Sequence, residues 1–429
     1  MKKILELKNC FLLAGLLAIT LASCKKDNNT GGINGTPGGS GPPTIASVHT
    51  IEKGVVDSML RVVTVAYNSS GVLDTTNSYY NYGPQVTAFD STTTTGNLGN
   101  YYVIMGANLG STTKIAINGI SIYFNRALNS DNTVIFSIPS TIPYVQPQPN
   151  TIVLTTLHGT VTYSFTVLPP SPIILAVSDY DFWSGSQLTL IGKGFASVSS
   201  VKLRATGDAF TIVTVNDSTL VLNAPTTTTA TESTLLFTYT SGANANAQTA
   251  STATFNDLDN AYNIYFKSSF QNSWGDNSWS GPSGSQSGNP HEYGGTKSIE
   301  ATYPAGAWQI EGWANYYPSI AYDPTYKYLS FWVKGGVAKH TLVLVGNQMA
   351  GGYGQVQNTN AYAAQLVTVP PGVWTYFKIP LSPTQVSTNP NFLAFWNNGS
   401  PASQLGFFLQ GMPGDVNETM YFDEVAFLK

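Results

Sequence analysis

The chain has 429 residues and a formal net charge of −4, and only 10% of its residues are charged, against roughly 25% in an ordinary soluble domain. The region after the leader has no cluster of lysine and arginine, which argues against nucleic acid as a partner because phosphate neutralisation needs a basic stripe. At roughly 150 residues a domain, the length predicts about three domains. A surface whose polarity comes from hydroxyls and amides suits a neutral, hydroxyl-rich ligand.

Residues 1–23 are predicted to be an export signal. A positively charged start precedes an apolar run over residues 11–21 that is too short to span a bilayer. The Leu-Ala-Ser-Cys sequence that ends at Cys24 resembles the bacterial lipoprotein box, which implies cleavage before Cys24 and its lipidation; the alternative is a plain signal peptide. Because Cys10 lies inside the signal, Cys24 is the only cysteine of the mature chain, and an exported protein without a disulfide is expected.

Residues 24–43 form a stretch rich in Gly, Pro, Asn and Ser, and we expect a flexible tether because this composition cannot bury a core. After it, short β-branched and aromatic runs alternate with Gly, Pro, Asn and Ser. No 3.6-residue apolar period is sustained, so the chain is predicted to be all-β.

Two stretches of the β-rich region repeat each other at an offset of 86 residues, which separates both the glycines 106 and 192 and the prolines 139 and 225 (192 − 106 and 225 − 139). This offset predicts a tandem Ig-sized unit. In each copy a strand runs into a turn whose glycines permit positive φ. The turns resemble those of the IPT/TIG immunoglobulin-like fold and read Gly106-Ala107-Asn108-Leu109 and Gly192-Lys193-Gly194-Phe195.

The limits of the two units follow from prolines and composition. The first unit, with an N-terminal extension, is predicted over residues 44–168, and the second over residues 169–257. Successive prolines after Leu168 mark the boundary because they block both helix and central strand. The extension, residues 44–100, forms either a further small β-domain or extra strands on the first sandwich, and the sequence leaves both alternatives open.

Residues 262–429 differ in composition from the rest, since seven of the eight tryptophans lie there. Several short alternating strands in this segment predict a β-sandwich of the jelly-roll kind. The runs KSIEATY, YLSFWVKGG, WTYFKIPL and YFDEVAF resemble the strand order of carbohydrate-binding jelly rolls.

The stretch GAWQIEGWANYYPSIAY, residues 306–322, divides by parity when it is taken as a strand. One face is mostly apolar and is predicted to enter the core, with Trp308, Ile310, Gly312, Ala314 and Tyr316. The other face mixes aromatic rings with amides and a carboxylate and is predicted to meet a ligand, with Gln309, Glu311, Trp313, Asn315 and Tyr317.

A sugar ring has apolar C–H faces and hydroxyls around its edge, so its binding needs an aromatic plane and nearby hydrogen-bonding groups. The polar face of residues 306–322 offers both and is therefore a candidate glycan-binding site. Further candidates are aromatic residues in loop-like contexts, namely Trp279, Trp274, Tyr353 and Trp396. Two other tryptophans, Trp332 and Trp374, lie in regular strands and are assigned to the core.

Catalysis has little support in the sequence. Glycoside hydrolysis uses two carboxylates across the scissile bond, and Glu311 has Glu292, Glu300 or Asp276 as partners without a spacing motif that selects one. The four histidines show no metal-binding spacing, so no metal site and no enzyme is predicted. Asp423 is placed where jelly rolls hold a structural ion or a core hydrogen bond, which admits a calcium ion in this domain.

The order of leader, tether, tandem IPT/TIG-like units and aromatic-rich jelly roll resembles the surface glycan-binding proteins of Bacteroidetes polysaccharide utilisation loci. The resemblance implies an outer-membrane lipoprotein that captures polysaccharide at the cell exterior for a TonB-dependent transporter and its SusD-like partner. Two alternatives remain. A surface adhesin or structural protein would keep the fold without binding soluble glycan, and a glycan-cleaving enzyme would line a cleft with a carboxylate pair.

Overall fold

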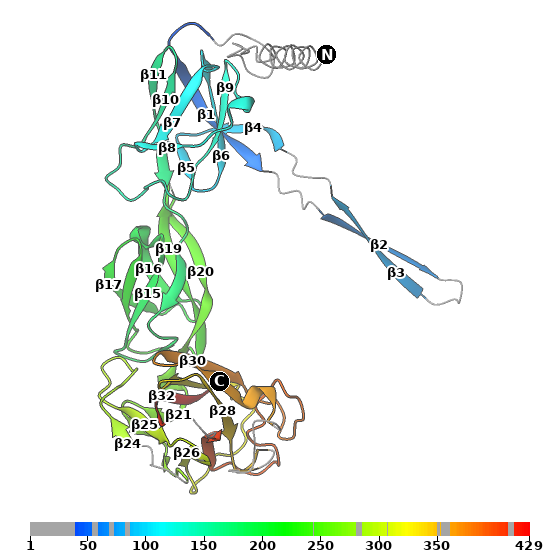
Figure 1. The fold of residues 1–429 in the computed structure, drawn as a ribbon, viewed down its shortest axis with the longest axis vertical. Helices are drawn as coiled ribbons and strands as arrows, with labels where there is room; N and C mark the ends of the chain where they lie inside the picture. The colour runs from blue at the N-terminus through cyan, green and yellow to red at the C-terminus, as the bar shows by residue number, and fades with distance from the viewer. Residues whose placement is uncertain are drawn as a thin grey trace, which may run out of the picture. The chain divides into compact units, whose positions relative to one another are not determined.

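The computed structural model describes residues 39–53, 59–67, 73–81, 86–242, 244–279, 285–306, 308–349, 352, 361–410 and 416–429. The predicted lipidation site Cys24 and the candidate Tyr353 lie outside the described residues. The chain divides into two compact units, Met1–Pro170 and Ser171–Lys429, which are described separately (Figure 1). Across the described residues, no helix has the length and hydropathy needed to cross a bilayer.

The predicted all-β class is confirmed, because the described regular elements are β-strands and short 3-10 helices. The first unit contains β1 (Thr44–Lys53), β2 (Met59–Tyr67), β3 (Leu73–Asn81), β4 (Val86–Thr92), β5 (Thr95–Asn97), β6 (Tyr101–Ala107), β7 (Thr112–Ile117), β8 (Ile120–Ile122), η1 (Arg126–Leu128), β9 (Thr133–Ser137), β10 (Thr151–Thr156), β11 (Gly159–Ser164) and β12 (Thr166–Leu168).

Two four-stranded sheets form the first sandwich, in the orders β4-β1-β6-β9 and β11-β10-β7-β8, and β5 pairs in parallel with β12. Alternate residues of both sheets bury one apolar core, which includes Ile104, Phe136, Ile115 and Leu154. Successive side chains of a strand point to opposite faces, so a strand with one face on a core buries every second residue. Strand β9 has this alternating burial.

The N-terminal extension, left open by the sequence, contributes strands to the first sandwich and also forms a separate pair. Strand β1 lies between β4 and β6 in the first sheet. Among the described residues, strands β2 and β3 pair with each other and with no other strand, in an antiparallel register from Met59 opposite Asn81 to Tyr67 opposite Leu73.

The second unit begins with a second Ig-like domain. Its elements are β13 (Ile173–Val177), β14 (Asp181–Phe182), β15 (Gln187–Lys193), η2 (Phe195–Ser197), β16 (Val198–Leu203), β17 (Ala209–Val215), β18 (Thr219–Asn223), β19 (Glu232–Ser241), β20 (Asn244–Asp257) and η3 (Leu258–Asn260). They form one continuous sheet, β13-β15-β18-β17-β16-β19-β20-β14, which wraps around its own core.

The repeated turn has the same physical basis in both Ig-like domains. A Cβ on Gly106 would lie 1.9 Å from the Thr44 carbonyl oxygen, and a Cβ on Gly192 would lie 1.9 Å from that of Ile173, so only glycine fits. The third turn position has positive φ, 59° at Asn108 and 77° at Gly194. The fourth, leucine in the first copy and phenylalanine in the second, is fully buried.

The C-terminal domain contains β21 (Tyr262–Phe266), β22 (Ser269–Phe270), β23 (Gly275–Asp276), β24 (Ser285–Ser287), β25 (Ser298–Tyr303), β26 (Trp308–Ala314), β27 (Tyr328–Lys334), β28 (His340–Val345), η4 (Ala363–Gln365), β29 (Leu366–Val369), β30 (Trp374–Pro380), β31 (Gln404–Gln410) and β32 (Glu418–Leu428).

These strands form the predicted two-sheet sandwich. One sheet, here called the junction sheet, has the order β22-β21-β32-β25-β24, with β27 joining β32 to β30. The other, here called the open sheet, has the order β23-β26-β31-β28-β29. Their inner faces enclose the main core of the domain, in which Trp313, Phe407 and Phe422 are in mutual ring contact.

The junction sheet is covered on its outer side by the second Ig-like domain. Trp183 and Leu258 of that domain share an apolar cluster with Phe266, Ala426 and Leu428 of the C-terminal domain. This contact covers part of the outer side of the junction sheet, whereas no residue of the open sheet belongs to the cluster.

Candidate functional site

The predicted strand in residues 306–322 exists as β26, but the side chains point opposite to the expectation. Trp313 is fully buried in the core between the two sheets. Ile310 instead belongs to a small apolar cluster on the outer side of the open sheet, against which the partly buried Trp308 packs. The prediction that Trp308 anchors the core while Trp313 meets a ligand is therefore wrong.

The polar residues of the inner face are buried with hydrogen-bond partners, which lowers the cost of burial that motivated the prediction; among the described residues, only Gln309 Oε1 on this face has none. The Gln309 amide donates to the Thr302 carbonyl oxygen over 2.6 Å. The Trp313 indole N–H donates to Glu311 Oε1 over 3.0 Å. With exposures of 3% and 2%, Gln309 and Glu311 do not reach a ligand in this structure.

The residues after Ala314 leave the strand, so parity no longer orders them. Asn315 is buried, and its amide donates to the Asn272 carbonyl oxygen over 3.1 Å, which corrects its assignment to the ligand face. Tyr316, predicted in the core, is 63% exposed, and Tyr317 is 92% exposed as expected for a ligand contact.

Two further candidate tryptophans are buried and are corrected from ligand contacts to core residues. Trp274 donates its indole N–H to the Tyr262 hydroxyl over 3.2 Å, and Trp396 donates to the Ile320 carbonyl oxygen over 2.9 Å. In both cases the loop that carries the ring folds into the core, so a loop-like sequence did not indicate exposure.

Trp279 is 52% exposed and follows β23, the strand at one end of the open sheet's strand order. Its backbone pairs with Ile310, with N–H···O distances of 3.0 and 3.1 Å, so its side chain shares the outer side of the sheet with Trp308. The two indoles meet edge to face with centroids 4.7 Å apart. Trp308 in turn contacts Phe408 at 4.9 Å, which fixes the pair on the apolar cluster beneath.

Tyr316 is held beside the same edge by two amide side chains. Its hydroxyl donates to Asn277 Oδ1 over 3.2 Å and accepts from Gln404 Nε2 over 2.7 Å. Asn277 precedes Trp279 by two residues, and its N–H donates to the Gly312 carbonyl oxygen of β26. The group formed by Trp279, Trp308, Tyr316 and Tyr317 with these two amides is called the aromatic edge below.

Trp308, Tyr316, Asn277 and Gln404 were not among the residues predicted to bind a ligand. Strand parity shows which residues share a face but does not say which face enters the core. The signal for Tyr316 was the proline that follows Tyr317, because proline ends a central strand and places its neighbours in a connection.

Glu311 has a raised pKa, but its side chain is buried and does not reach the surface. Burial raises its pKa to about 8, against the opposing hydrogen bonds from Ser278 and Trp313. The Ser278 hydroxyl lies 2.6 Å from Asp276 Oδ1 and 3.0 Å from Glu311 Oε2, so it links the exposed carboxylate to the buried one. Of the predicted carboxylate partners, Glu292 is buried and accepts a hydrogen bond from the Ser268 N–H, whereas Asp276 is connected to Glu311 through the Ser278 hydroxyl.

Asp423 forms core hydrogen bonds, one of the two roles considered for it. Its Oδ2 accepts the N–H groups of His291 and Glu292 over 2.8 and 3.2 Å, and its Oδ1 accepts that of Glu424 over 3.0 Å. Three backbone donors therefore occupy three of the roughly four acceptor sites of the carboxylate.

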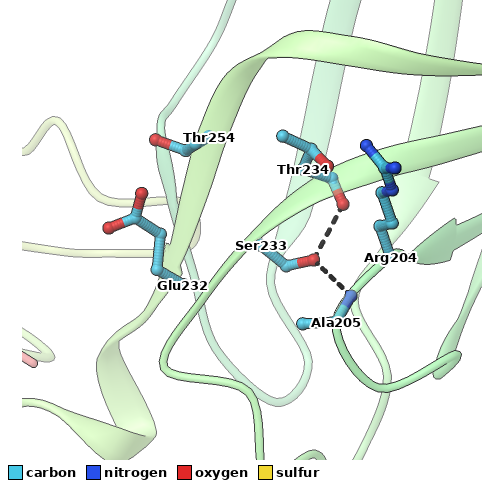
Figure 2. A pocket seen from close by; sticks show the side chains of 6 residues that line it. All are labelled: Arg204, Ala205, Glu232, Ser233, Thr234 and Thr254. Atoms are coloured by element: carbon cyan, nitrogen blue, oxygen red, sulfur yellow. Dashed lines mark hydrogen bonds between the residues drawn. The ribbon is translucent and has the colours of Figure 1, made fainter.

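A shallow surface pocket of about 450 Å³ lies in the second Ig-like domain, lined by Arg204, Ala205, Glu232, Ser233, Thr234 and Thr254 (Figure 2). Its central hydroxyl is already bonded, since Ser233 donates to the Thr234 carbonyl oxygen and accepts from the Ala205 N–H. The lining has no aromatic ring, which makes it a poorer surface for a sugar than the aromatic edge.

No family model matches the chain. Over 118 residues the chain is 35% identical to an IPT/TIG domain-containing protein of Bacteroides ovatus, an alignment that covers 27% of this chain and 24% of the relative. The chain is a homologue of that IPT/TIG protein. The matched segment spans about a quarter of the length of this relative. The relative's IPT/TIG description agrees with the resemblance of the repeated turns to the IPT/TIG fold.

Three solved surface glycan-binding proteins are similar in fold. One from Prevotella bryantii is 15% identical with a TM-score of 0.45, covering 91% of this chain and 99% of that one. One from a xyloglucan utilisation locus of Bacteroides uniformis is 16% identical with a TM-score of 0.35, covering 78% and 96%. One from Bacteroides ovatus, bound to a mixed-linkage heptasaccharide, is 12% identical with a TM-score of 0.29, covering 84% and 82%. Likeness at this level does not extend their ligands to this chain.

Proposed function

We propose that the chain is a non-catalytic surface protein that binds polysaccharide through the aromatic edge of its C-terminal domain. The observation that carries the proposal is the exposure of Trp279, Tyr316 and Tyr317 beside two amide side chains, on the sheet that the second Ig-like domain leaves uncovered. Exposed rings with neighbouring amides match the apolar faces and hydroxyl rim of a sugar.

The expected affinity is modest. Each ring in contact with a sugar contributes on the order of 0.5–1.5 kcal/mol beyond area burial, if the estimate for aromatic pairs applies. Two or three rings with a few hydrogen bonds give a dissociation constant in the micromolar to millimolar range, about 4 to 8 kcal/mol. Repeated units along one polysaccharide chain strengthen the binding further through multivalency.

The leader and tether complete the proposal. Lipidation of Cys24 anchors the chain in the outer membrane, and residues 24–43 space the first Ig-like domain from the lipid. The two Ig-like domains act as a stalk for the C-terminal domain at the cell exterior. The resemblance to proteins of polysaccharide utilisation loci supports delivery of the glycan to a TonB-dependent transporter and its SusD-like partner.

Affinity electrophoresis tests the binding step. The chain without its first 24 residues is run through gels that contain xyloglucan, mixed-linkage glucan, mannan, xylan or starch. The solved structures described above come from loci for the first two, so these polymers head the panel. We expect at least one polymer to retard the protein, and Trp279→Ala and Tyr317→Ala each to weaken that binding by about 2- to 12-fold.

Tyr123→Ala is the matched control, because Tyr123 is 83% exposed but lies in the first Ig-like domain. This variant is expected to be retarded like the wild type. Retardation that survives both edge substitutions would remove the aromatic edge from the site while leaving glycan binding in place. Migration unaffected by every polymer would favour a surface adhesin, and release of reducing sugar would favour an enzyme.

A further inference from the structure

Asp179, His291 and Glu424 meet where the second Ig-like domain contacts the C-terminal domain, and one ligand atom from each lies within 4.8 Å of the others. Asp179 lies between β13 and β14, His291 between β24 and β25, and Glu424 in β32. The three residues are far apart in sequence and come from two domains, so no spacing motif reveals them. They are called the junction triad below.

The triad is held in a defined arrangement. His291 Nδ1 lies 2.7 Å from Glu424 Oε2 and 3.7 Å from Asp179 Oδ2. The imidazole ring stacks on Trp332, with centroids 3.8 Å apart and planes 19° apart. Asp179 Oδ1 accepts the Trp332 indole N–H over 3.0 Å and the Asp181 N–H over 2.9 Å, which leaves Oδ2 toward the imidazole.

Buried carboxylate oxygens at this place have no hydrogen-bond donor. Among the described residues, Glu424 Oε1 and Asp181 Oδ2 are unpartnered, although both side chains are fully buried. An unsatisfied buried acceptor costs about 1–3 kcal/mol, more when it is charged. The other oxygen of Glu424 faces His291, so its carboxylate is directed into the triad.

The charges at the triad are also unbalanced. The side chains of Asp179, Asp181 and Glu424 are buried together at this place. The carboxyl groups of Asp179 and Glu424 lie within hydrogen-bonding reach of each other. The nearby Lys378 already binds Glu232 and Asn256, each over 2.9 Å. Two carboxylates in contact need either a shared proton or a cation between them.

The backbone at Glu424 is in the left-handed region, with φ of 50°. This conformation costs a non-glycine residue roughly 1–2 kcal/mol. It occurs at the residue that directs its carboxylate into the triad, and strain of this kind is concentrated at binding sites.

We propose that Asp179, His291 and Glu424 form a binding site for one divalent transition-metal ion, best matched by Zn²⁺, which joins the second Ig-like domain to the C-terminal domain. An imidazole nitrogen with two carboxylate oxygens is a ligand set that zinc accepts.

The distances between the ligand atoms suit a tetrahedral site. At Zn–N and Zn–O distances of about 2.0–2.1 Å, ligand atoms of a tetrahedral site lie roughly 3.3 Å apart. The observed 2.7 and 3.7 Å lie on either side of that value. Asp181 Oδ2, a buried oxygen without a partner among the described residues, would supply a fourth ligand.

The chain without its first 24 residues, stripped with a chelator and dialysed, is the protein to test. Titration with ZnCl₂ in a calorimeter is expected to show one bound ion per chain. Thermal unfolding is expected to rise by roughly 5 to 10 °C when free Zn²⁺ exceeds the dissociation constant about 100-fold. CoCl₂ is expected to give visible absorption bands of a low-coordinate site, a direct readout of bound metal.

Glu424→Gln and Asp179→Asn keep the shape of each side chain but remove a ligand charge, and each is expected to abolish the calorimetric signal, the thermal shift and the cobalt bands. Asp276→Asn, at an exposed carboxylate, and Asp323→Asn, at a half-buried one, lie outside the triad; they are the controls and should bind like the wild type. Cobalt bands measured on protein that is still folded separate loss of a ligand from loss of the fold.

The proposal is overturned if the stripped wild type binds neither Zn²⁺ nor Co²⁺ at concentrations up to about 1 mM, which would leave a shared proton as the link between the carboxyls. It is equally overturned if binding and thermal shift survive Glu424→Gln. A thermal shift by CaCl₂ but not by ZnCl₂ would replace the transition metal with a hard cation and overturn the assignment to zinc.

Discussion

The two sheets of the C-terminal domain both carry aromatic rings on their outer sides, but their surroundings differ. On the junction sheet, Trp332 and Tyr376 stack against Tyr180 of the second Ig-like domain, with centroids 6.4 and 5.0 Å from its ring. On the open sheet, Trp279 and Tyr316 remain exposed. Aromatic content alone therefore does not distinguish an exposed ring surface from a domain interface. The two are distinguished by whether another element covers the rings.

Hydrogen bonding separates the two groups as well. The Trp332 indole donates to Asp179, and the Tyr376 hydroxyl donates to Asp181 Oδ1 over 3.0 Å and accepts from Asn256 over 2.9 Å. These contacts join two domains. The Tyr316 hydroxyl is bonded within its own domain, to amides that keep the ring in place but leave its faces open to solvent.

The largest expected contrast is between a buried and an exposed tryptophan of the open sheet. Trp313→Ala removes a fully buried ring and its hydrogen bond to Glu311, so it should lower the free energy of unfolding by about 3–5 kcal/mol. Trp279→Ala should change it by less than about 1 kcal/mol. Urea unfolding of both variants measures the difference, and equal losses would contradict the assignment of the two faces.

The next effect concerns pH. In the folded state, burial raises the pKa of Glu311 to about 8, whereas the unfolded value is about 4.3. At a pH between these two values, the folded state therefore keeps a proton on Glu311 that the unfolded state has lost. This contribution to stability is therefore present below the unfolded pKa and is lost as pH rises toward 8. Glu311→Gln should remove roughly 2 kcal/mol of the stability change between pH 5.5 and 7.5. Urea unfolding of the wild type and of Glu311→Gln across this pH range measures the difference. If both show the same dependence of stability on pH, Glu311 does not titrate in this range.

A smaller effect is expected at the covered side of the domain. Tyr376→Phe keeps the stack on Tyr180 but leaves Asp181 and Asn256 with one partner fewer, and the free energy of unfolding should fall by about 1–2 kcal/mol. The loss should appear in thermal unfolding of the second Ig-like domain and the C-terminal domain together. Unfolding in two separate steps in the wild type would contradict a firm contact between them.

The smallest effect is predicted at the matching hydroxyl on the open side. Tyr316→Phe removes a hydroxyl bonded to Asn277 and Gln404 but leaves its partners in contact with water, so unfolding should change by less than about 0.5 kcal/mol. If the aromatic edge binds glycan, affinity in the gels above should weaken by about threefold or less, because the ring itself is retained. A stability loss as large as that of Tyr376→Phe would remove the contrast between the two sides.

The sequence predicted the parts of the fold that depend on local rules. The 86-residue offset and the turns at Gly106 and Gly192 indicated the tandem Ig-like units, because each glycine is required by a carbonyl oxygen that would touch a Cβ. The strand β26 and the division of its side chains into two faces were also predicted. Which face is buried depends on the opposing sheet, and neither Gln309 nor Glu311 reveals in sequence the partner that makes its burial tolerable.

The site itself was predictable only in part. Trp279 and Tyr317 are exposed as predicted, whereas Trp274, Trp313, Trp396 and Asn315 are buried. Trp308 was assigned to the core because the wrong face of β26 was taken as the buried one, and Tyr316 because strand parity was extended past Ala314, where the strand ends. The junction triad lay beyond sequence reasoning, since its three residues come together only when two domains pack.

The packing of the junction sheet against the second Ig-like domain has a mechanical consequence. A polymer bound at the aromatic edge, as proposed, would exert a force on the C-terminal domain when it is pulled by flow. That force passes into the second Ig-like domain through side-chain contacts, including the ion pair of Lys378 with Glu232 at 2.9 Å and the apolar cluster around Trp183. If the aromatic edge binds a polysaccharide as proposed, the rupture strength of this contact limits how hard the bound polymer can be pulled.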